Sequence, residues 1–124
     1  MSPSEPPHQV KRRWRDYRTE MGRRPVKEFL DGLSDVDAAA VAASMKDVRE
    51  HGLVATRHLR DDIYEVRADG NRQSFRILFA PEGEHGQVLL SLNGFSKKTQ
   101  KTPPDEITLA ETRLRDWRTR GSRT

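Results

Sequence analysis

The sequence contains no cysteine, which excludes a disulfide framework and any metal site built on thiolates. Long apolar runs are also missing. The longest, VLLSL at residues 88–92, falls far short of the roughly 20 residues that a membrane-spanning helix needs. The N-terminal segment MSPSEPPHQV has no hydrophobic signal region and predicts a flexible lead over residues 1–9. We therefore expect a soluble cytoplasmic protein that does not associate with membranes.

Apolar and aromatic residues are scarce. Hydrophobic residues make up 33% of the chain and aromatic residues 6%, against 34% that are charged. This composition predicts a thin core under a heavily charged surface. At 124 residues the chain fits a single domain, which we place at residues 10–120. The net charge of +4 favours a polyanionic partner, most often nucleic acid.

The first half of the chain predicts an edge strand and two helices. Residues 10–20 partly alternate between polar and apolar side chains, and their arginines suit an exposed strand edge. Pro25 suits the first position of a short helix that ends near Gly32. Ser34 can cap a longer helix over residues 34–52, and the two helices are close enough in sequence to form an antiparallel hairpin.

The second half changes to the period of β-strands. Strands are predicted at residues 62–68, 73–80 and 87–95, and the short turns between them predict an antiparallel meander. A final helix is expected over residues 102–120, capped at Thr102. This order predicts an α+β fold: an antiparallel sheet made of the N-terminal edge strand and the three-stranded meander. Two N-terminal helices and one C-terminal helix would pack on one face of that sheet.

Alternation along the strands predicts which side chains face outward. Ile77 and the phenylalanines two residues away on either side share one face, which must be the core side. Arg76 therefore points to the opposite, open face. The same reasoning places Glu65 and Arg67 on the open face, so these three charged residues should lie together. Charged residues are normal on an open antiparallel face, because that face meets water; their joint placement is what favours a binding surface.

A cluster of lysines follows the last predicted strand. Lys97, Lys98 and Lys101 crowd into five positions without an acidic residue among them, so they repel one another unless something negative binds there. Phe95 and Lys97 share a strand face, and if it is the open face the lysines join the arginines. Guanidinium groups bind phosphate oxygens as forks, lysines act as point charges, and a ring can stack on an unpaired base.

The ordered segments IYEVR, FRILF and LNGFSKKTQKTPPDEI resemble the HigB-like, phage-derived branch of the RelE/ParE toxin superfamily. The likeness covers about residues 24–118 and is most specific in the second half. It implies a small RelE-like α+β toxin that cleaves messenger RNA, usually on the translating ribosome. It also implies neutralisation by a cognate antitoxin that carries a helix-turn-helix. We expect no cofactor; the sequence leaves the oligomeric state of the free toxin open, with a monomer favoured.

Carried across residue by residue, the resemblance puts Arg67, Arg76, Lys97 and Lys98 in the active surface. Phe95 stands where relatives in the wider superfamily often have a tyrosine or histidine. A phenylalanine can stack on a base but cannot move a proton, so a general base must come from elsewhere. The further residues expected to bind RNA are Phe95, Lys101, Arg72 and Arg60.

The predicted chemistry uses the ribose 2′-hydroxyl as the nucleophile on the adjacent phosphate. Arg67 and Arg76 would stabilise the charge that develops on the phosphate. Lys97 or Lys98 could exchange protons because neighbouring cations disfavour the ammonium form, and Glu65 is the alternative base. The sequence shows no cluster of metal ligands, so we do not expect a metal-dependent nuclease.

Two other functions stay open at this stage. A toxin of the same fold could inhibit DNA gyrase, as the ParE branch does. A non-catalytic module could have kept the basic surface and lost cleavage, which Phe95 and the lack of histidine in the matched motifs would allow. His58, which precedes the first strand of the meander, is expected to be structural.

Overall fold

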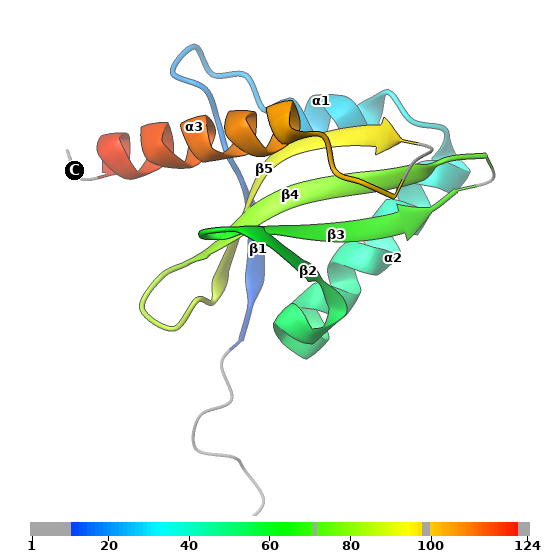
Figure 1. Ribbon diagram of the computed structural model, residues 1–124, viewed down its shortest axis with the longest axis horizontal. Coiled ribbons are helices and arrows are strands. Elements are labelled where there is room, and N and C mark those ends of the chain that lie inside the picture. The colour runs from blue at the N-terminus through cyan, green and yellow to red at the C-terminus, as the bar shows by residue number, and fades with distance from the viewer. Residues whose placement is uncertain (1–10, 71, 98–99, 122–124) are drawn as a thin grey trace, which may run out of the picture.

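The computed structural model describes residues 11–70, 72–97 and 100–121. The elements in chain order are β1 (Arg13–Asp16), α1 (Pro25–Asp31), α2 (Asp35–His51), the 3-10 turn η1 (Gly52–Ala55), β2 (Arg57–Arg60), β3 (Ile63–Asp69), β4 (Ser74–Glu82), β5 (Val88–Lys97) and α3 (Pro104–Gly121). The protein is therefore α+β (Figure 1). No helix in these ranges is both long enough and apolar enough to span a bilayer. The predicted lead at residues 1–9 and Lys98 lie outside the described residues.

The five strands form one sheet in the order β1-β5-β4-β3-β2. The predicted meander is confirmed, because β3, β4 and β5 pair antiparallel. The edge strand is confirmed only over Arg13–Asp16, and it runs parallel to β5, so the prediction of a wholly antiparallel sheet is wrong. Three other strands and two helices separate β1 from β5 in the chain, so no hairpin turn dictates an antiparallel direction.

The strand β2 was not expected from the sequence. Its four residues, RHLR, include one apolar side chain, Leu59, which is too little alternation to predict a strand. It pairs antiparallel with β3 and forms the second edge of the sheet. Its position matters for the site, because it adds Arg57 beside Glu65.

Helices cover both faces of the sheet, and the prediction of helices on one face is wrong (Figure 1). On one side, α1 and α2 bury the alternating residues of β4 that the sequence marked as core, including Ile77 and Phe79. On the other side, α3 packs Ala110 and Leu114 on a second apolar layer. The sheet residues of that layer are Ile63, Leu78, Ala80, Leu90 and Leu92. Over part of their length the central strands carry apolar residues on both faces of the sheet. Each face must therefore be covered by a helix to keep these residues out of water.

Trp14 connects the edge strand to the first core layer. Its indole Nε1 donates a hydrogen bond to the backbone carbonyl of Met45 at 2.7 Å. Its ring meets Phe79 edge to face, with centroids 5.0 Å apart. This single side chain therefore ties β1 to both α2 and β4, which explains why a four-residue strand is held in place.

The helix signals in the sequence are confirmed for α1 and α2 but not for α3. Pro25 is the first residue of α1, and the Ser34 hydroxyl accepts a hydrogen bond from the backbone N–H of Asp37. Gly52 ends α2 with a φ of 79°, a conformation that favours glycine. The last helix begins at Pro104, so the predicted cap at Thr102 is wrong; its hydroxyl is used in the site described below.

Gly94 in β5 gives a direct test of how tightly α1 packs on the sheet. A Cβ at this position would lie 2.5 Å from Phe29 Cδ2 and 2.9 Å from Ile77 Cδ1, much closer than van der Waals contact. We expect Gly94→Ala to lower the free energy of unfolding by about 1–3 kcal/mol, as overpacking usually does, and so to lower the urea midpoint. Gly32→Ala is the control, because its nearest neighbour would be a backbone oxygen at 3.5 Å. Equal midpoints for the native chain and Gly94→Ala would contradict this packing.

Candidate active site

The strand register brings the predicted site residues to one place. Arg67 of β3 lies opposite Arg76 of β4, which in turn lies opposite Phe95 of β5. Lys97 lies opposite Ser74, one step further along the same face. Directly opposed residues share a sheet face, so the predicted common face of the arginines, the ring and Lys97 is confirmed.

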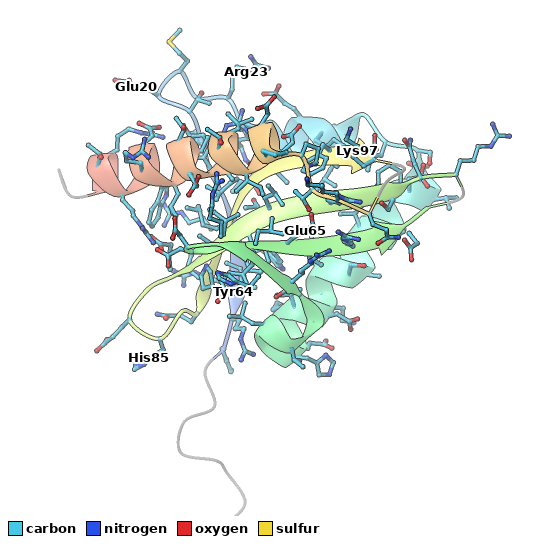
Figure 2. The ribbon with its side chains drawn as sticks, viewed as in Figure 1. Glu20, Arg23, Tyr64, Glu65, His85 and Lys97 are labelled. Atoms are coloured by element: carbon cyan, nitrogen blue, oxygen red, sulfur yellow. The ribbon has the colours of Figure 1, made fainter. Side chains whose placement is uncertain are left out.

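The face is covered rather than open, and this corrects the sequence prediction. The residues Glu65 and Arg76 are each 1% exposed. The segment that leads into α3 lies over them, and its Thr102 is buried as well. Arg67 keeps 25% of its side chain exposed, so it connects the interior to the surface. Figure 2 labels Glu65 on β3 and Lys97 at the end of β5, on either side of β4.

Glu65 organises this region through both of its carboxylate oxygens. Its Oε1 accepts a hydrogen bond from Arg67 Nε at 2.5 Å. Its Oε2 accepts one from the Thr102 hydroxyl at 2.5 Å and lies 3.9 Å from Arg76 Nη1. A fully buried carboxylate is stable only when donors and cations surround it in this way. We call Glu65, Arg67, Arg76, Gln100 and Thr102 the Glu65 cluster.

The outer edge of the Arg67 guanidinium is presented to oxygen atoms. Nη1 donates to the side-chain Oε1 of Gln100 at 2.7 Å, and Nη2 donates to the backbone carbonyl of Gln100 at 2.5 Å. Two parallel bonds to two oxygens are the geometry that an arginine fork makes with a phosphate or a carboxylate. The inner nitrogen, Nε, is meanwhile fixed by Glu65.

Arg76 is a buried cation behind Arg67. Its Nη1 lies 3.5 Å from the Thr102 hydroxyl oxygen. Burial lowers the pKa of the Arg76 guanidinium. The positive charges of Arg67 and Arg57 lower this pKa as well, whereas the Glu65 carboxylate raises it. An arginine nevertheless stays protonated at neutral pH, so the site keeps an excess of positive charge.

A hollow of about 310 Å³ opens next to the Glu65 cluster. Its lining consists of Arg57, Leu59, Gln100, Lys101, Thr102 and Ile107. Lys101 therefore stands where the sequence placed it, at the cationic surface. Arg57 was missed, because the RHLR segment gave no strand signal from which its face could be read.

Phe95 and Lys97 lie at the rim of this site. Phe95 is half-buried and packs against the apolar layer under α3, so part of its ring is accessible. Lys97 is exposed at the end of β5. The rim therefore combines a ring and a cation next to the arginine fork.

Two of the predicted RNA-binding residues lie apart from the Glu65 cluster. Arg60 Nη2 is paired with Glu111 of α3 at 2.5 Å and belongs to the other end of β2. Arg72 is exposed in the turn between β3 and β4, and within the described ranges it makes no hydrogen bond or ion pair with the cluster. Their role in RNA binding stays a prediction.

His58 does not contribute to the cluster. Its Nε2 is 2.6 Å from the backbone carbonyl oxygen of Asp61, and its ring centroid is 4.8 Å from that of Tyr64. Tyr64 packs in the layer under α2, so His58 stands against the opposite face of the sheet from Glu65. This contact fits the expected structural role. Among the described residues, the other histidines, His51 and His85, are exposed and belong to α2 and to the β4–β5 turn.

Comparison with known proteins gives the family. A family model described as "Phage derived protein Gp49-like (DUF891)" matches residues 28–115, a range that contains the whole Glu65 cluster. Two proteins named "Probable endoribonuclease HigB1", from Mycobacterium tuberculosis strains CDC 1551 / Oshkosh and ATCC 25618 / H37Rv, are each 34% identical to this chain over 108 residues. The alignments cover 85% of this chain and 84% of each relative. The chain therefore belongs to the phage-derived, Gp49-like family of HigB-like toxins.

Proposed function

We propose that this protein is the toxin of a toxin–antitoxin pair and that it is an endoribonuclease acting on messenger RNA. The name of the two mycobacterial relatives supports the activity, and the family supports the toxin role. The α+β architecture, with a cationic site on the sheet next to the last helix, is in keeping with a RelE-like fold and with one toxin domain over residues 10–120.

The observation that carries the proposal is the state of the Arg67 fork. Glu65 holds Nε from the buried side, and the other two nitrogens bind two oxygens of Gln100. A phosphate of the RNA backbone would take the place of these two oxygens and bring its negative charge to the fork. The fork is already oriented before the substrate arrives, and preorganised donors are what stabilise a developing charge best.

The cleavage step that we propose transfers a phosphoryl group within the RNA. The 2′-oxygen attacks the adjacent phosphorus, the bond from phosphorus to the 5′-oxygen breaks, and a 2′,3′-cyclic phosphate and a 5′-hydroxyl are formed. One proton leaves the 2′-hydroxyl and one reaches the departing 5′-oxygen. Arg67 would stabilise the extra charge on the phosphate, and Phe95 would stack on a base.

Lys97 and Lys98 are the groups that we propose for proton transfer. Glu65 was the alternative base, but both of its oxygens accept hydrogen bonds inside the protein and its side chain is 0% exposed. We therefore propose that Glu65 positions Arg67 and does not exchange protons with RNA. Arg76 is also buried, so its charge would act on the phosphate through the arrangement of the cluster.

We also propose that cleavage occurs on the translating ribosome without a metal ion, and that a helix-turn-helix antitoxin neutralises the toxin. The resemblance to HigB-like toxins supports the ribosome and the antitoxin. Metal independence is proposed from the cations that the site does contain, Arg67 and Arg76. Cationic side chains would supply the charge that a metal supplies in other nucleases.

The substitution Arg67→Lys tests whether cleavage needs the forked geometry of the guanidinium group or only its positive charge. Lysine keeps a cation beside Glu65 but cannot make two parallel bonds to one phosphate, so we expect cleavage of a message in a translation extract to slow about 100- to 1000-fold. Arg49→Lys is the matched control, since Arg49 is exposed on α2. Cleavage at the native rate by folded Arg67→Lys would refute the assignment.

The native protein also distinguishes the alternative functions. Inhibition of gyrase supercoiling without RNA cleavage would indicate a ParE-like toxin, and RNA binding without cleavage would indicate a non-catalytic module.

Lys97→Gln and Lys98→Gln test the proton-transfer role. Removal of a group that moves a proton should slow cleavage more than it weakens RNA binding. The two quantities are the single-turnover cleavage rate and the dissociation constant for the same message. Equal losses in both would make the lysine an electrostatic contact only.

Chelation tests metal independence. We expect toxin that is dialysed against EDTA and then added to a translation extract to cleave a message at the same rate as untreated toxin. The control is toxin incubated with excess Mg²⁺. A loss of activity that only added metal ions to the toxin restores would contradict the proposed mechanism.

A further inference from the structure

A second basic hollow lies far along β5 from the Glu65 cluster. Its volume is about 660 Å³, and its lining consists of Trp14, Arg15, Asp16, Arg18, Arg24, Trp117 and Arg120. It wraps around the edge strand β1, between the C-terminal part of α3 and the chain that leads from β1 to α1. We call it the β1–α3 groove.

The groove has more positive charge than its own carboxylates balance. Arg24 Nη2 pairs with Asp16 at 2.6 Å, and Arg120 Nη2 pairs with Asp116 at 2.8 Å. For Arg15 and Arg18, in contrast, no carboxylate lies within 4 Å in the part of the chain that the structure describes. Both side chains are exposed. The groove therefore holds two positive charges that no acidic neighbour neutralises.

A neighbouring hollow on α3 has the opposite balance, since its lining includes three carboxylates, of Asp61, Asp62 and Glu111, and two arginines, Arg115 and Arg118. There Arg118 is paired with both Asp62, at 3.0 Å, and Glu82, at 2.7 Å. Arginines at an edge strand can serve only to prevent strand pairing with other molecules. That explanation does not cover Arg18, which lies beyond the end of β1 and lines the same hollow.

One tryptophan, Trp117, forms an aromatic wall of the groove on the α3 side of the sheet. The Arg15 guanidinium carbon lies 5.9 Å from the centre of the Trp117 ring, a cation–π contact that restricts the arginine. Trp14 also borders the groove, but its indole packs on Phe79 under α2, on the opposite face of the sheet. Trp117 is half-buried, so it is held in place and is still partly accessible. A flat ring beside arginines is a combination on which a nucleic-acid base stacks while the neighbouring phosphates are bound.

We propose that the β1–α3 groove binds the phosphate backbone of a folded RNA, at a contact separate from the Glu65 cluster. This rests on the proposed function, which makes RNA the substrate. β1 pairs with residues 88–91 of β5, whereas Phe95 and Lys97 lie four to nine residues further along that strand. At about 3.3 Å per residue the two sites are roughly 13–30 Å apart, so one RNA can reach both only if it spans several nucleotides.

We favour RNA over an acidic protein segment as the ligand of the β1–α3 groove for two reasons. Carboxylates would neutralise the arginines but would make no use of the Trp117 ring, whereas a base could stack on it. One RNA molecule could also occupy both cationic sites of the same sheet, and such a second contact would raise its affinity by holding it near the first.

The test measures binding of a 2′-O-methyl RNA hairpin, which cannot be cleaved through a 2′-hydroxyl. The variant Arg15→Gln/Arg18→Gln is compared with Lys46→Gln/Arg49→Gln on the exposed side of α2, which removes the same charge. We expect the groove variant to weaken binding at every salt concentration and to lower the slope of log affinity against log salt by about two. The control should change neither clearly, and melting curves check that both variants fold.

Three results would overturn the proposal. The first is a groove variant that binds the hairpin as tightly as the native chain. The second is an equal loss of affinity in both variants, which would show that only net charge matters. A groove variant that binds RNA normally but loses binding of poly-glutamate would assign the groove to an acidic protein segment. The hairpin cannot be cleaved, so the outcome does not depend on catalysis. A native chain that binds it through the groove but cuts no message would refute the proposed function alone.

Discussion

The site depends on one buried carboxylate between two arginines. The strand register sets Arg67 directly opposite Arg76, and two like charges in that position repel. Glu65 lies on the same face, bonds Arg67 through one oxygen, and approaches Arg76 with the other. Removal of one member of such a buried set typically costs about 3–5 kcal/mol, because the remaining charge has no compensation. The Glu65 carboxylate thus allows Arg76 to stay charged while it is buried next to Arg67.

Because of this arrangement, the Arg67 side chain loses its conformational entropy when the chain folds and not when RNA binds. An exposed arginine loses side-chain entropy when it grips a ligand. Arg67 has already lost much of that freedom, because Nε is fixed by Glu65, and Glu65 is fixed in turn by the Thr102 hydroxyl. The remaining two nitrogens face oxygen acceptors in a defined geometry. What the fold supplies is therefore an oriented fork backed by buried positive charge, a suitable partner for a phosphate at which charge develops.

The sequence predicted which residues share the face of the site, but it did not predict that this face is buried. Strand alternation is local, so it correctly grouped Glu65, Arg67 and Arg76 on one face, and the register added Phe95 and Lys97. Burial of that face is not local. It depends on a helix that begins at Pro104 and on the apolar residues of the second layer, which occupy the same face further along the strands. The direction of β1 was equally out of reach, since only packing such as that of Trp14 determines it.

The central claim, that Glu65 holds the Arg67 fork ready for a phosphate, is tested most directly by a crystal structure with a bound RNA analogue that lacks the reactive 2′-hydroxyl. The account predicts that two phosphate oxygens replace the Gln100 oxygens at Nη1 and Nη2 of Arg67, while the bond between Glu65 and Nε stays in place. A scissile phosphate bound elsewhere, with Arg67 still on Gln100, would contradict it.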